Sequence, residues 1–68
     1  MLSGLTHTVE CCDNGVRWEV IAAFNCEPAA MAYGGECHMV HYENAYRVRE
    51  IVHTKTTAGE IVHTWGAG

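Results

Sequence analysis

The dipeptide Asn14-Gly15 separates two runs of alternating apolar and polar residues within the stretch CCDNGVRWEV. Asn-Gly favours a two-residue type I′ turn, because both residues readily adopt the positive φ angles that this turn requires. The sequence therefore predicts a β-hairpin whose loop is Asn14-Gly15. The predicted register pairs five positions, which are Asp13 with Val16, Cys11 with Trp18, Val9 with Val20, His7 with Ala22 and Leu5 with Phe24.

Side chains alternate between the two faces of a strand, so this register gives the hairpin one apolar and one polar face. The paired positions form the apolar face, which is expected to pack against the rest of the domain. The expected polar, solvated face carries Thr6, Thr8, Glu10, Cys12, Arg17, Glu19, Ile21 and Ala23.

The alternation ends after Phe24, and the segment NCEPAAMAYGGECHMVHYEN follows a helical period. Asn25 suits the N-cap of a helix, and Pro28 suits its first turn. Gly34 and Gly35 each cost about 1 kcal/mol relative to alanine, so the helix depends on packing against the sheet. The face expected to supply that packing consists of Ala29, Ala30, Tyr33, Cys37 and Val40.

The pentapeptide EIVHT occurs at residues 50–54 and again at residues 60–64, which predicts two strands of a second hairpin. Gly59 suits the left-handed position of a three-residue loop at residues 57–59, but a two-residue loop at residues 58–59 fits as well, so the register stays open. Glu50 interrupts the alternation and suggests a bulge. Tyr46, Val48 and Val52 are expected on one face, with Arg47, Arg49, Ile51 and His53 on the other.

These elements predict one α+β domain over residues 1–68, with the order ββαββ. If the third strand docks beside the first, the four-stranded antiparallel sheet has the order 2-1-3-4, and one helix packs on one of its faces. A chain of 68 residues that is 49% hydrophobic can form one small core.

Charge and hydropathy exclude several classes of function. Four basic residues against eight acidic ones give a net charge of -4, which leaves no basic stripe for direct nucleic-acid binding. No run approaches the roughly 20 apolar residues of a membrane span, and the first ten residues lack the features of a secretion signal. We therefore expect a cytoplasmic protein with reduced thiols.

Metal binding is the most specific chemical function that the cysteine and histidine positions suggest. Cys37 and His41 lie one helical turn apart, with Cys11 or His7 beneath them, whereas Cys26 is roughly 16 Å from Cys37 along the helix. A second possible set is Cys12, His53 and His63. Neither set contains a CxxC pair, so we expect no metal and no cofactor.

Catalysis is not expected either. Cys37 and His41 are the nearest approach to a thiol and its base, but no orienting group or oxyanion signature accompanies them. The sequence predicts a non-enzymatic protein.

The outer face of the predicted helix gathers five residues within an arc of about 100°: Met31, Gly35, His38, Met39 and Tyr42. Methionine and tyrosine are enriched at protein interfaces, so this face is our predicted partner-binding site. The alternatives are a homodimer contact and exposed apolar side chains without a role.

The segments EPAAMAYGGEC, YRVRE and TTAGEIV, in this order, give the chain a resemblance to the small accessory proteins of phages and mobile elements, of which single-domain anti-CRISPR proteins are the best-defined group. The resemblance implies an inhibitor that occupies a surface of a CRISPR-Cas effector complex in the host cytoplasm and blocks target binding or nuclease recruitment. It assigns no role to any single residue. A zinc-stabilised structural domain and a homodimeric subunit of a larger assembly are the other two functions considered, and the target and oligomeric state stay open.

Overall fold

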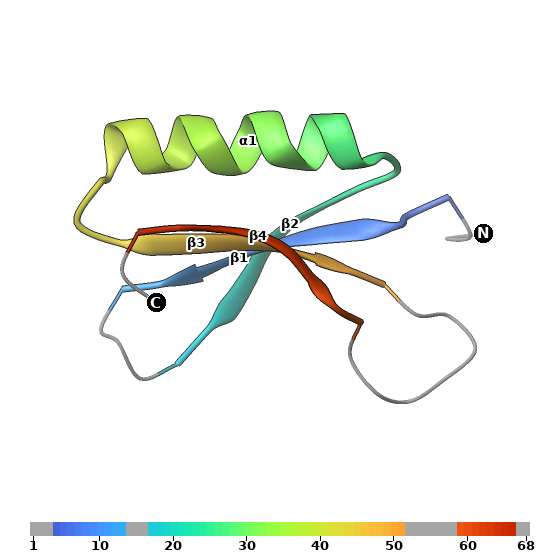
Figure 1. The fold of residues 1–68 in the computed structure, drawn as a ribbon, viewed down its shortest axis with the longest axis horizontal. Helices are drawn as coiled ribbons and strands as arrows, with labels where there is room; N and C mark the ends of the chain where they lie inside the picture. The colour runs from blue at the N-terminus through green and yellow to red at the C-terminus, as the bar shows by residue number, and fades with distance from the viewer. Residues whose placement is uncertain (1–3, 14–16, 52–58, 67–68) are drawn as a thin grey trace.

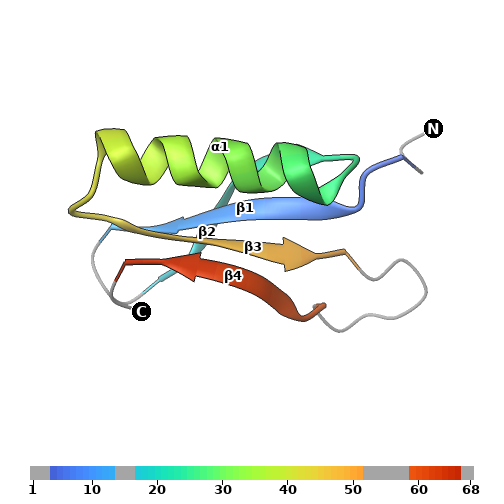
Figure 2. The same ribbon diagram turned by 45° about the horizontal axis from the view of Figure 1, so that its top comes forward.

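The computed structural model describes residues 4–13, 17–51 and 59–66. Its elements follow the order β1 (His7–Cys12), β2 (Glu19–Phe24), α1 (Glu27–Val40), β3 (Ala45–Glu50) and β4 (Ile61–Trp65). The strands form one antiparallel sheet with the order β2-β1-β3-β4. Helix α1 lies across one face of this sheet, and no other described helix or strand covers the opposite face (Figure 1 and Figure 2). The predicted α+β fold of ββαββ order is therefore confirmed, including its strand order.

The register of the first hairpin differs from the predicted one. Val9 lies opposite Ala22, and the pairing then shifts so that Glu10 lies opposite Val20. This shift leaves one extra residue in β2, which is a β-bulge and moves Val20 to the face opposite Ala22. Counting the alternation of residue types cannot detect such an insertion. The predicted turn at residues 14–15 lies outside the described residues.

The core lies between α1 and the two central strands. Val9 of β1, Ala30 of α1 and Val48 of β3 are fully buried. Burial of a valine side chain contributes about 1.5–3 kcal/mol, so two facing valines account for much of what a core this small can supply. The partly buried residues around them are Ala22, Phe24, Met31, Val62 and Trp65.

Helix α1 is rotated about its own axis by roughly a quarter of a turn from its predicted orientation. Ala30 and Gly34 are buried, whereas Tyr33 and Val40 of the predicted core face are 37% and 65% exposed. The small residues face inward because they let the helix axis approach the sheet and the side chain of Trp65. The predicted face contained larger apolar residues, but these would have kept the two layers further apart.

The helix also begins one residue later than expected. Its N-cap is Cys26, in an extended conformation, and no side chain there bonds to the helix end. Pro28 lies in the first turn as predicted, where its missing N–H costs nothing.

In the second hairpin, the paired residues lie further apart in sequence than the EIVHT repeat predicts. A three-residue loop at residues 57–59 would place His63 opposite His53. His63 instead lies opposite Val48, so that register is wrong. The pairing shifts between Val48 and Arg49 and leaves Val62 as an extra residue in β4, so this bulge lies on β4 and not at Glu50 of β3 as predicted. Gly59 does not have a positive φ. Residues 52–58, with most of the first EIVHT copy and most of the predicted loop, lie outside the described residues.

Candidate interaction surfaces

The thiols do not form a metal centre in the described part of the chain. All four cysteines there are free, and no group of three or more His, Cys, Asp and Glu side chains among the described residues is arranged to hold a metal ion. Cys12 is buried on the uncovered face of the sheet, whereas His63 lies opposite Val48 and therefore on the helix face. These two residues cannot share one ion, and His53 lies outside the described residues.

Cys11 lies in a small polar cluster around Tyr46, on the helix face of the sheet. The side chains of Tyr46 and Cys11 are hydrogen bonded, and Asn44 Nδ2 donates to Tyr46 Oη at 3.4 Å. Burial raises the pKa of the Cys11 thiol and of the Tyr46 phenol. Because the thiolate is the nucleophilic form of cysteine, this environment suits a structural thiol better than a reactive one.

The predicted pair Cys37 and His41 lies at the C-terminal end of α1. His41 is exposed, and its Nδ1 lies 3.6 Å from the Glu43 carboxylate at the end of the helix. Cys37 is half-buried, and its charge and hydrogen bond raise the pKa of the Tyr33 phenol.

The structure divides the predicted partner-binding set, because α1 is rotated. Met39 and Tyr42 are 81% and 77% exposed, as the sequence led us to expect. The outer placement of the other three is wrong. Met31 packs against the core, and Gly35 lies beside the Trp65 ring. The half-buried His38 contacts Tyr46 edge-on, with 6.3 Å between the two ring centroids. The binding role of all five residues stays a prediction.

One surface at the end of α1 combines exposed apolar side chains with carboxylates. We call it the helix surface and define it by Glu36, Met39, Val40, Tyr42 and Glu43, all of which are exposed. Glu36 and Met39 are three residues apart and so share one side of the helix. The C-terminal end of a helix also carries a partial negative charge, which adds to that of the two carboxylates.

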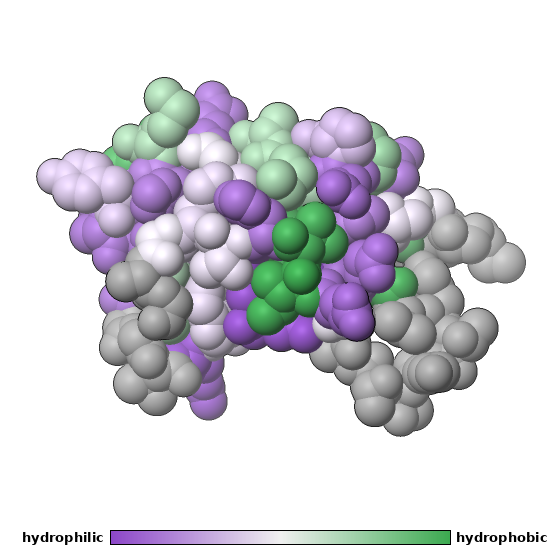
Figure 3. Space-filling view, in the orientation of Figure 1, coloured by the Kyte–Doolittle hydropathy of each residue, from purple (hydrophilic) through white to green (hydrophobic). Residues whose placement is uncertain are grey.

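The negative charge is not confined to the helix surface but extends over the helical layer, residues 25–44. Residues 25–44 contain Glu27, Glu36 and Glu43 and no lysine or arginine. On the side drawn in Figure 3, hydrophilic and mildly apolar residues mix over α1, and the strongest apolar colour gathers over β4. Ile61 of β4 is 45% exposed.

The uncovered side of the sheet forms a second surface, which we call the open face. The register places on it Glu10, Arg47 and Arg49, because Glu10 lies opposite Arg47 on β3 and Arg49 is two residues further along. Its other members are Thr8, Cys12, Trp18, Val20, Ile61 and Thr64.

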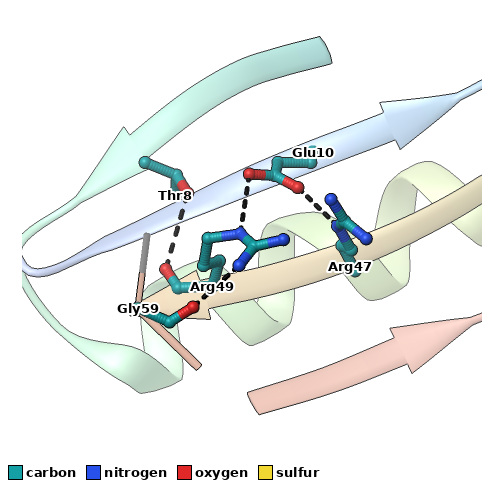
Figure 4. A network of polar contacts seen from close by, with 5 residues as sticks. All are labelled: Thr8, Glu10, Arg47, Arg49 and Gly59. Carbon is teal, nitrogen blue, oxygen red and sulfur yellow. Dashed lines mark hydrogen bonds and ion pairs between the residues drawn. The ribbon is translucent and has the colours of Figure 1, made fainter. Parts of the chain in front are cut away.

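Glu10 joins the two arginines of the open face in one network (Figure 4). The Glu10 carboxylate is largely buried and accepts hydrogen bonds from Arg47 Nε and, at 3.2 Å, from Arg49 Nε. Arg49 Nη1 also donates to the carbonyl oxygen of Gly59 at 2.7 Å. The network ties together β1, β3 and the residue that leads into β4.

The indole of Trp18 extends this network toward β2. The Arg47 guanidinium carbon lies 4.1 Å from the centroid of the Trp18 ring, which is a cation–π contact. Two guanidinium groups against one carboxylate leave the open face with a net positive charge, although the whole chain has a net charge of -4.

The sequence interpretation treated this face as ordinary solvated sheet and missed the network. The signal that could have found it is the presence of a lone glutamate on one central strand and two arginines at i and i+2 on the other.

No family model, curated protein or solved structure matches the chain. Among the described residues, no helix has both the length and the apolar character needed to cross a lipid bilayer.

Proposed function

We propose that this chain is a small non-enzymatic protein-binding module that acts in the cytoplasm through its helix surface. The observation that carries the proposal is the exposure of Met39 and Tyr42, at 81% and 77%, beside a Val40 that is 65% exposed. Single exposed apolar side chains are normal, but three within four positions at one helix end concentrate apolar surface that a partner can desolvate.

The chemistry of these side chains supports the proposal. Methionine adapts its shape to a partner, and tyrosine offers a large ring with a polar tip, which is why both are enriched in interface cores. The half-buried Cys11 thiol, with its raised pKa, and the exposed His41 favour binding over catalysis as the role of the described residues.

The specific form that we propose is an inhibitor of a CRISPR-Cas effector complex encoded by a phage or mobile element. Its support is the resemblance carried by EPAAMAYGGEC, YRVRE and TTAGEIV, together with a small α+β fold. An inhibitor of this kind needs only a surface that competes with target binding or nuclease recruitment, and the helix surface could serve as one.

The test is a phage-protection assay in bacteria with an active CRISPR-Cas system, combined with co-purification of the tagged protein and the effector complex. We expect the protein to restore phage growth and to co-purify with the complex. Met39→Glu combined with Tyr42→Glu should abolish both effects, because each change would bury an unpaired carboxylate in the contact.

The matched control is Val20→Glu combined with Ile61→Glu. These residues are exposed apolar side chains of the open face, on the other side of the sheet. The control should restore phage growth like the unchanged protein. Equal loss in both variants would contradict the assignment of the helix surface, and a lack of effect of the unchanged protein across a panel of CRISPR-Cas types would contradict the inhibitor function.

A further inference from the structure

We propose that the helix surface of one copy of this chain docks on the open face of a second copy, in a head-to-tail contact. The first observation is the separation of charge between the two sides of the sheet. Lysine and arginine are absent from residues 25–44, and Arg47 and Arg49 lie on the face that α1 does not cover. Glu36 and Glu43 are exposed and belong to the helical layer.

The two surfaces are complementary in charge. The helix surface carries two carboxylates and the negative end of the helix dipole. The open face carries two guanidinium groups, on side chains that are 17% and 21% exposed, and the more deeply buried carboxylate of Glu10, so this network has a net positive charge. Apposed patches of opposite charge steer association and fix its orientation.

The two surfaces also match in their apolar content. Met39, Val40 and Tyr42 lie on one, and the exposed Val20 and Ile61 flank the Trp18–Arg47 pair on the other. Tryptophan, tyrosine and arginine are the residue types that dominate binding energy at interfaces. A contact of ordinary size would cover about 800 Å² on each copy, which is roughly a sixth of the surface of 4708 Å².

The same charges disfavour a symmetric contact through either surface alone. Pairing two helix surfaces would bring two acidic patches together, and pairing two open faces would bring two basic patches together. A contact between different surfaces is heterologous, so a dimer keeps one free helix surface on one copy and one free open face on the other, and larger assemblies form with rising concentration.

The experiment is sedimentation velocity of the purified protein over a concentration range of about 1 µM to 1 mM. We expect the mean mass to rise with concentration at an ionic strength of about 0.05 M and to fall back toward the monomer at about 0.5 M, where screening is strong. A protein that stays monomeric over this range at low salt would overturn the proposal.

Two variants test the head-to-tail geometry. Met39→Ser with Tyr42→Ser damages only the helix surface, and Val20→Ser with Ile61→Ser damages only the open face. Each variant should be monomeric alone, but an equimolar mixture should form a 1:1 dimer and nothing larger, because one intact surface of each kind remains. A mixture that stays monomeric, or a single variant that dimerises like the unchanged protein, would overturn the proposal.

A second pair of substitutions, which removes charge alone, keeps the proposal testable if the serine variants do not fold. Glu36→Gln with Glu43→Gln keeps the apolar contacts, so the association constant should fall several-fold at low salt and little at high salt. Glu19→Gln, an exposed carboxylate on neither surface, is the matched control and should leave association unchanged. An equal effect of both would contradict the charge complementarity.

This inference does not depend on the proposed inhibitor function, because self-association is measured with the purified chain alone. Both functions use the helix surface, so a bound effector complex should displace the second copy. A monomeric protein that still restores phage growth would overturn the self-association and leave the inhibitor function standing.

Discussion

Gly34 of α1 and the indole of Trp65 lie so close that no side chain fits between them. A Cβ atom on residue 34 would be 2.8 Å from Cη2 of Trp65 and still closer to Cζ3. The glycine that weakens the middle of the helix is therefore the residue that lets the helix approach β4. The packing of the indole on bare backbone offsets the helix propensity that glycine loses.

This contact predicts opposite effects for two neighbouring substitutions. Gly34→Ala should lower the free energy of unfolding by about 1–2 kcal/mol, because the overpacking cost exceeds the gain in helix propensity. Gly35→Ala should raise it by up to about 1 kcal/mol, because its Cβ would meet Trp65 only at an ordinary distance of 3.7 Å. Urea unfolding followed by circular dichroism measures both, and equal effects would contradict the close approach at residue 34.

The buried carboxylate of the open face gives a second prediction. Glu10→Gln removes the charge between Arg47 and Arg49 but keeps the shape of the side chain, so the free energy of unfolding should fall by about 1.5–3 kcal/mol. Glu19→Gln, on the exposed strand β2, should change it by less than about 0.5 kcal/mol. If Glu10→Gln is as mild as its control, the network contributes little to stability.

The rotation of α1 predicts how two methionines respond to the same substitution. Met31 packs against the core, so Met31→Glu should cost at least about 2 kcal/mol or prevent folding. Met39 is 81% exposed, so Met39→Glu should leave the free energy of unfolding within about 0.5 kcal/mol of the unchanged protein. Thermal unfolding of the two variants decides between this orientation and the one expected from the sequence, in which Met31 was exposed.

The pKa shifts of Cys11 and Tyr46 predict a loss of stability at alkaline pH. Burial raises both pKa values in the folded protein above the usual values of 9.0 and 10.0, so the folded state favours the neutral thiol and phenol. Their contribution is complete below pH 9 and is lost as the pH rises through the folded pKa values. Urea midpoints measured between pH 7 and pH 11 should therefore be level at first and then fall.

Two variants separate the groups responsible for this alkaline loss. Cys11→Ala should remove the part that begins near pH 9, and Tyr46→Phe should remove the part that begins near pH 10. An unchanged pH profile in both variants would assign the alkaline loss to other residues.

The order of the elements could be predicted from the sequence because each one has a local signature. The alternating runs on either side of Asn14-Gly15 indicate the first hairpin, the spacing after Phe24 indicates the helix, and β-branched residues indicate the later strands. The orientation of the helix could not be predicted in the same way. Apolar residues occur around much of its circumference, and the choice of Ala30 and Gly34 as the inner face depends on Trp65, which is 31 residues further along the chain than Gly34.

The candidate surfaces could also be predicted only where they depend on local residue patterns. The exposure of Met39 and Tyr42 could be predicted from the sequence, whereas the placement of Met31 depends on the rotation of the helix. The network at Glu10 depends on a partner 37 residues away, Arg47, and on the register between two strands that are not consecutive. Local patterns carry no information about that register.

The central position of β1 has a consequence for how the chain reaches its folded state. β1 can pair early with its neighbour in sequence, β2, but its other edge pairs with β3, which begins at Ala45 beyond the whole of α1. Closing that distant contact is entropically slow, so we expect the joining of β1 to β3 to limit the folding rate. Until it forms, the backbone of β1 next to Val9 and Glu10 is an open strand edge, and this is the stage at which the protein is most exposed to aggregation.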